Sequence, residues 1–138
     1  MSRPRRTVPA VASSTSIEMP RRLWAPLVAA LLLPAGCGSV TFVDRVVVVN
    51  DTDYSANVDV TGDDGGWLGL GSIPPHETLT VGQVIDQGAR WTFRFSYGSH
   101  DPVELEIDRR DLARAGWRVE VPPELETNLR AGGVPPPP

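Results

Sequence analysis

The sequence predicts an all-β fold, a small antiparallel β-sandwich of about seven strands with a short helix between the last two strands. Beyond residue 37, apolar and polar residues alternate over short runs, which is the pattern of half-buried strands. Clusters of Gly, Pro, Asn and Asp separate these runs at a spacing of about 8 to 12 residues, as in sandwiches and small barrels. With 138 residues, the chain has room for one domain and its tails.

The clearest strand is residues 90–97, in which every odd position is aromatic and every even position is polar. Residues 103–108 alternate apolar and polar residues in turn, and residues 98–102 between them contain Gly, Asp and Pro, which favour a turn. The two segments therefore predict a hairpin with both apolar faces directed inward. The expected cross-strand pairs are Phe95 with Leu105 and Arg94 with Glu106.

A run of consecutive valines at residues 46–49 predicts a strand that is covered on both faces or lies near the centre of a sheet. The other predicted strands lie at residues 57–60, 67–70, 77–85 and 117–121. The aromatic residues of the alternating runs are expected in the core. They are Trp91, Phe93, Phe95, Tyr97 and Trp117.

Two short helices interrupt or follow the last strands. Asp108 can cap a helix over residues 109–115, because its side chain can accept a hydrogen bond from a free N–H of the first turn. Pro123 at a first helical position predicts a second helix over residues 124–130, which a Gly-Gly pair then ends.

We expect the folded domain to span residues 37–131 and residues 132–138 to form an extended Pro-rich tail. The predicted architecture resembles the immunoglobulin-like group of sandwiches. This similarity is one of shape alone, because the Cys…Trp…Cys signature of true immunoglobulin domains is missing from the sequence.

The first 36 residues differ in character from the rest. Residues 1–18 are rich in Arg, Pro, Ser and Thr and lack apolar periodicity, so we expect them to be disordered. We interpret Met19 as the true start of translation, and a long positive leader beginning at Met1 is the alternative. Residues 19–36 combine a short positive head, an apolar run of about a dozen residues and small residues at the end, which predicts a secretory signal peptide.

Cys37, the single cysteine, ends the stretch LLLPAGC. This stretch resembles the lipobox of bacterial lipoproteins, in which small residues precede a cysteine that becomes the new N-terminus after its sulfur is acylated. Ala35 and Gly36 fit the two positions before the cysteine, whereas Pro34 stands where the family usually has leucine. The resemblance implies lipidation of Cys37 and attachment to the extracytoplasmic face of the cell membrane. A signal peptide cleaved nearby and an uncleaved N-terminal anchor are the alternatives.

Charge is distributed unevenly along the chain. All thirteen basic residues are arginine, a bias typical of a high-GC, actinobacterium-like genome. Residues 37–138 contain eight arginines and sixteen acidic residues, a formal charge of −8. A surface of that sign repels nucleic acid and anionic lipid headgroups, so we expect no nucleic-acid partner.

No catalytic residue, cofactor or metal site is predicted. The two histidines, His76 and His100, lie in turns, and neither accompanies a nucleophile turn such as G-x-S-x-G. Residues 50–53, with Asp59 and the aspartates of the next turn, are an alternative calcium site. Their spacing lacks the pattern of a calcium loop, and Asn and Asp at strand ends more often hydrogen-bond the backbone of turns.

Trp67, Asp63 and Asp64 are the candidate ligand contacts. The two aspartates belong to the turn before Trp67, and alternation does not decide whether Trp67 or Leu68 points inward. We expect Trp67 to pack in the core, and the alternative is an exposed ring that stacks on a sugar or a partner's surface. The expected function is a non-enzymatic binding or accessory module with a protein or cell-wall partner. A carbohydrate- or peptidoglycan-binding module and an enzyme of unrecognised type are the alternatives.

Overall fold

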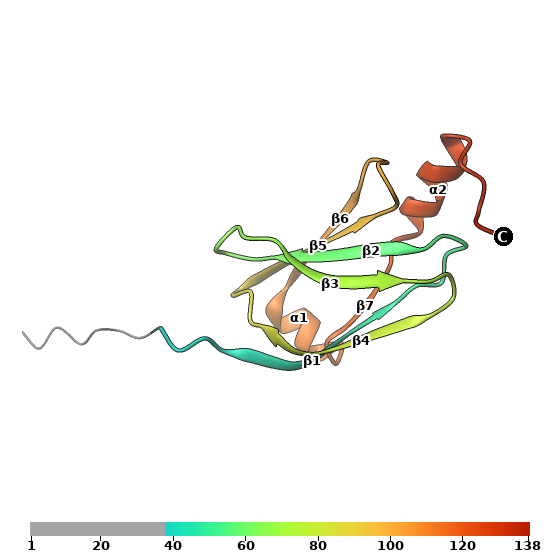
Figure 1. Cartoon of the computed structure of the whole chain (residues 1–138). Coiled ribbons are helices and arrows are strands. Elements are labelled where there is room, and N and C mark those ends of the chain that lie inside the picture. Colours follow the sequence, from blue (N-terminus) through green and yellow to red (C-terminus); the bar gives the residue numbers. More distant parts are fainter. Residues whose placement is uncertain (1–37) are drawn as a thin grey trace, which may run out of the picture. The chain divides into compact units, whose positions relative to one another are not determined.

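The computed structural model describes residues 38–138, which form two sheets that face each other across one core (Figure 1). One sheet has the strand order β4-β1-β7 and the other has the order β3-β2-β5-β6. The predicted β-sandwich of about seven strands, with a helix between the last two, is confirmed. The predictions for residues 1–37, including the signal peptide and the lipidation of Cys37, lie outside the described residues. The elements are β1 (Phe42–Val49), β2 (Ala56–Thr61), β3 (Leu68–Ile73), β4 (Thr78–Ile85), β5 (Arg90–Ser96), β6 (Val103–Asp108), α1 (Arg109–Arg114), β7 (Arg118–Glu120) and α2 (Pro123–Ala131).

The valine-rich strand β1 is the centre of the three-stranded sheet, as its sequence predicts. It pairs antiparallel with β4 and parallel with β7. Val46 and Val48 are fully buried, and Val47 is half-buried on the opposite face. The parallel pair departs from the expected antiparallel sandwich. It arises because the chain leaves the four-stranded sheet after β6, passes through α1 and enters the other sheet in the direction of β1.

The β5–β6 hairpin forms between the predicted segments, but the predicted register is wrong by two residues. Arg94 lies opposite Glu104 rather than Glu106, and Phe95 lies opposite Val103 rather than Leu105. A shift of two residues keeps every side chain on the same face, so alternation cannot distinguish the two registers. The turn decides between them: Gly98 adopts a φ of 55°, and the His100 N–H donates to the Tyr97 carbonyl at 3.1 Å.

The core is aromatic at its centre. Trp91, Phe93 and Phe95 are fully buried, with successive ring centroids 6.0 and 6.4 Å apart. Tyr97 and Trp117, which we expected in the core, are half-buried and pack against its edge. Among the described residues, the buried core cluster runs from Val43 to Leu129 and lies within the compact unit of residues 37–138.

Both predicted helices are present. The Asp108 side chain accepts a hydrogen bond from the Arg110 N–H at 2.8 Å and caps α1, which buries Leu112. Helix α2 has Pro123 in its first turn and directs Leu125 and Leu129 into the core. No helix within residues 38–138 is both long enough and apolar enough to cross a membrane.

An ion pair joins the start of α1 to the end of β4. The Arg109 guanidinium donates to both carboxylate oxygens of Asp86, at 2.8 to 3.2 Å, and lies 5.4 Å from the ring centroid of Trp117. The hydrogen bonds from Arg109 hold the pKa of Asp86 below its usual value, and Asp86 in turn raises the pKa of Arg109. This end of the sandwich is therefore closed by a bidentate pair.

Candidate functional site

Trp67 lies on the outer face of the four-stranded sheet and is 41% exposed. The expectation that it packs in the core is therefore wrong. Leu68 and Leu70 pack against the core instead. Because successive residues of a strand point to opposite faces, an inward Leu68 directs Trp67 outward.

Trp67 is part of a charged assembly that reaches across this sheet. The Arg94 guanidinium carbon lies 3.6 Å from the centroid of the Trp67 ring, a cation–π contact. The same guanidinium donates to Glu104, with its Nε 3.0 Å and its Nη2 2.9 Å from Oε1. The residue that precedes β3 and the strands β5 and β6 thus each contribute one side chain to this surface.

Strand β2 contributes a carboxylate to the same face of the sheet as Arg94. Asp59 of β2 lies opposite Gly69 on one side and opposite Arg94 on the other. A Cβ atom at Gly69 would lie 3.4 Å from Asp59 Oδ1, so glycine leaves room beside that carboxylate. We call Asp59, Trp67, Arg94 and Glu104 the Trp67 platform. It offers an aromatic ring flanked by hydrogen-bonding groups, the combination that fits a sugar or a polar protein surface.

The structure uses Asp63 to join two turns. Its carboxylate accepts a hydrogen bond from the Ala89 N–H at 2.9 Å, and its own N–H donates to the Gln87 carbonyl at 3.0 Å. Gly88, with a φ of 92°, is needed here, because a Cβ atom would lie 2.2 Å from an Asp63 oxygen. The Asp63 carboxylate is thus committed to this turn rather than to the Trp67 platform, whereas Asp64 is exposed at the tip of its own turn.

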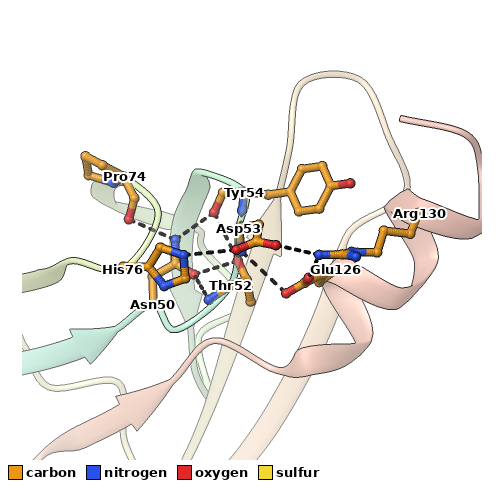
Figure 2. A network of polar contacts seen from close by, with 8 residues as sticks. All are labelled: Asn50, Thr52, Asp53, Tyr54, Pro74, His76, Glu126 and Arg130. Carbon is orange, nitrogen blue, oxygen red and sulfur yellow. Dashed lines mark hydrogen bonds and ion pairs between the residues drawn. The ribbon is translucent and has the colours of Figure 1, made fainter. Parts of the chain in front are cut away.

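A second polar cluster lies at the end of the sandwich where β1 ends (Figure 2). Asn50 is fully buried there, and its Nδ2 donates to the carbonyl oxygens of Tyr54 (2.8 Å), Pro74 (3.0 Å) and Ile73 (3.3 Å). Its Oδ1 accepts from the N–H (3.1 Å) and the hydroxyl (2.7 Å) of Thr52. Asn50 therefore connects the end of β1 in one sheet to the end of β3 in the other.

Next to Asn50, an exposed clasp holds α2 against the sandwich. Asp53 Oδ1 lies 3.0 Å from His76 Nε2, and Asp53 Oδ2 accepts from Arg130 at 2.5 Å (Figure 2). Arg130 also pairs with Glu126 at 2.5 Å, and this carboxylate raises the pKa of Arg130. Behind the clasp, the Tyr54 hydroxyl donates to the Val134 carbonyl at 2.7 Å.

Sequence reasoning missed the clasp, because its partners are 23 and 77 residues from Asp53. An aspartate beside a histidine is two-thirds of a nucleophile triad. Within residues 38–138, however, the one side-chain partner of His76 is Asp53, so the pair has no hydroxyl to activate. The second histidine, His100, stacks on Tyr97 with ring centroids 6.1 Å apart.

The oxygen-rich residues considered as a calcium site do not converge. Asn50 and Thr52 are occupied by hydrogen bonds to each other and to the backbone, and Asp63 belongs to a different turn. In the described part of the chain, no three His, Cys, Asp or Glu side chains are grouped to hold a metal ion.

Comparison of the chain with protein-family models, with curated proteins and with solved structures found no match. We therefore assign no family to it. The surfaces available for function are those that its own residues define, and among residues 38–138 the Trp67 platform combines an exposed aromatic ring with charged groups.

Proposed function

We propose that the chain is a lipid-anchored, extracytoplasmic binding module without enzymatic activity. The observation that carries this proposal is the position of the folded unit. Residues 37–138 form one compact unit, and β1 begins at Phe42, a few residues after the cysteine of the lipobox-like stretch. Cleavage before Cys37 would leave every core residue of that unit in place.

Acylation of Cys37 supplies the attachment. A single acyl chain binds a membrane only reversibly, whereas two or three chains on the same cysteine hold a protein stably. The acylated cysteine has no free thiol, so it takes no part in redox or nucleophilic chemistry. The anchored domain then presents its surfaces to the cell wall and to other extracytoplasmic proteins.

Replacing Cys37 with serine tests the anchor. Serine cannot form the thioether to the lipid. The variant is therefore expected to be lost from the detergent-extracted membrane fraction or to accumulate as an uncleaved precursor. The measurement is fractionation of a bacterium that expresses the full chain, with Ser39→Ala as the control, because it alters the same segment and keeps the cysteine. A C37S chain of mature size that stays with the membrane like wild type would refute lipidation.

The Trp67 platform is the surface we propose for the partner. One specific observation favours a cell-wall glycan: an exposed indole contacts Arg94, and Arg94 lies opposite Asp59 and pairs with Glu104, so the same surface offers an aromatic ring and carboxylates that can accept hydrogen bonds from sugar hydroxyls. A protein partner is the other candidate for the same surface, since the platform is polar at its rim and aromatic at its centre.

The Trp67→Ala variant distinguishes these two partners. If the platform binds glycan, residues 37–138 should cosediment with insoluble peptidoglycan. The W67A variant should weaken this binding by about two- to tenfold, because ring stacking contributes about 0.5–1.5 kcal/mol beyond buried area. Ile85→Ala is the matched control, because Ile85 is exposed to a similar extent on the other sheet. Equal sedimentation of W67A and wild type would exclude a glycan site at Trp67 and favour a protein partner.

A further inference from the structure

Exposed apolar side chains are concentrated at one corner of the sandwich. In residues 38–138, the large hydrophobic side chains that are exposed are Val40 (61%), Phe42 (53%), Ile85 (43%) and Trp67. The first three lie together at the beginning of β1 and the end of β4. We call Val40, Phe42 and Ile85 the apolar tip.

The ladder between β1 and β4 places Phe42 and Ile85 on one face. Phe42 lies directly opposite Ile85, and residues directly opposite each other share a face of the sheet. The Asp86 N–H donates to the Thr41 carbonyl at 2.9 Å, so the pairing continues one residue before β1. Val40 lies two residues before Phe42, in the segment that leads into β1, and is exposed as well.

The apolar tip is separated from Cys37 by very little chain. Only Gly38 and Ser39 lie between Cys37 and Val40. At about 3.3–3.6 Å per extended residue, Val40 lies within about 11 Å of Cys37 along the chain and Phe42 within about 18 Å. A lipid on Cys37 would thus hold the tip at the level of the lipid headgroups.

We propose that the apolar tip docks on the surface of the phospholipid bilayer to which Cys37 is anchored, and so fixes the orientation of the domain. The inference rests on the proposed lipid anchor. The acyl chains supply the attachment, and Val40, Phe42 and Ile85 enter the boundary between headgroups and acyl chains, as the apolar face of an interfacial helix does. Trp67, on the outer face of the other sheet, remains outside this contact.

The charges around the tip fit a bilayer whose net charge is small. Arg45 has no ion pair among the described residues. Beside the tip lies a depression of about 460 Å³ whose lining includes Phe42, Trp117 and the charged residues Asp44, Arg45 and Arg109. The Arg45 guanidinium can reach a lipid phosphate while its stem stays on apolar surface. The formal charge of −8 on residues 37–138 opposes strongly anionic lipid, so the contact is expected to depend on the apolar residues.

Docking through the tip determines which parts of the domain face away from the membrane. The start of β1 and the helix α2 lie at opposite ends of the sandwich (Figure 1). The clasp of Asp53, His76 and Arg130 is at the α2 end. The bound domain therefore directs α2 and its clasp toward the cell wall.

The test attaches the domain chemically at the same position. Residues 37–138 carry one cysteine, which can be coupled to a maleimide lipid in phosphatidylcholine vesicles that contain brominated acyl chains. Phe42→Trp reports on the tip, and Ser99→Trp, in the exposed β5–β6 turn, is the matched control. Because residues 37–138 keep Trp67, Trp91 and Trp117, each signal is read as the difference from the wild-type domain coupled to the same vesicles. The expected difference for F42W is a blue-shifted, quenched emission at a depth of about 5–10 Å into the interface, and S99W is expected to add no quenching.

Further variants make the outcome specific. Adding Ile85→Gln to F42W should remove most of the quenching. If F42W does not fold, Val40→Trp takes its place as the reporter and should be quenched in the same way. Equal quenching at positions 42 and 99 would overturn the proposal. A dimer of the uncoupled wild-type domain, seen by sedimentation and abolished by F42Q, would overturn it too, because a second copy of the chain would then cover the tip. The maleimide lipid replaces the cellular lipid in this experiment. A failure of the tip to dock would therefore not count against the lipid anchor, which the fractionation of C37S tests separately.

Discussion

The Phe93→Ala variant of residues 37–138 is expected to lose about 3–5 kcal/mol of its free energy of unfolding. Phe93 is fully buried between Trp91 and Phe95, so truncation removes the transfer free energy of the ring and leaves a cavity at the centre of the core. A domain of this size is stable by about 5–15 kcal/mol, so the variant should be largely unfolded well below the wild-type midpoint. Urea unfolding followed by far-UV circular dichroism measures the difference.

Phe42→Ala is the control, because it removes the same side chain from a position that is 53% exposed. Its cost should stay within about 0.5 kcal/mol. Similar losses for F93A and F42A would mean that the core does not lie between the two sheets as described.

The Asn50→Ala variant is expected to cost about 2–4 kcal/mol, because it leaves several buried polar groups without partners. The carbonyls of Tyr54, Ile73 and Pro74 lose their donor, and the Thr52 N–H loses its acceptor. Asn50→Asp keeps the shape and the acceptor oxygen but places an ionised carboxylate against those carbonyls. At pH 7 it should therefore be at least as destabilising as the alanine variant.

The matched control for Asn50 is Asn57→Ala, since Asn57 is exposed on β2 and carries the same side chain. Its effect on the free energy of unfolding should be within about 0.5 kcal/mol. If N50A were as mild as N57A, the Asn50 network would not be what connects the two sheets at this end.

Local patterns in the sequence were sufficient for the strands and the helices. The alternation in residues 90–97 predicts the buried face of β5, and the valines of β1 predict its central place, because burial on one or both faces is a property of the strand itself. Asp108 and Pro123 predict where the helices begin for a similar reason, since the first turn of a helix selects its residues locally.

Three features depend on information that a local pattern does not carry. The β5–β6 register follows from the geometry of one turn, because shifts of two residues keep the same faces. The outward direction of Trp67 depends on which residue after the Gly-rich turn is the first to point inward, and alternation within the strand does not decide this. The Asn50 network and the clasp join residues up to 77 positions apart.

The candidate site is also only partly predictable from local sequence patterns. Trp67 is visible in the sequence as an aromatic residue after a turn, but its partners Arg94 and Glu104 lie on strands that only the sheet order brings beside it. Asp63, which the sequence placed with Trp67, is instead used to hold the neighbouring turn, because Asp side chains readily accept hydrogen bonds from turn N–H groups.

The mass of the N-terminal peptide of the protein extracted from membranes tests the proposed anchor most directly. A lipid-anchored chain should yield a peptide that begins at Cys37 and carries two or three acyl chains, with nothing of residues 1–36 attached. A membrane-derived peptide with an unmodified Cys37, or one that continues into residue 36 and beyond, would contradict the proposed anchor.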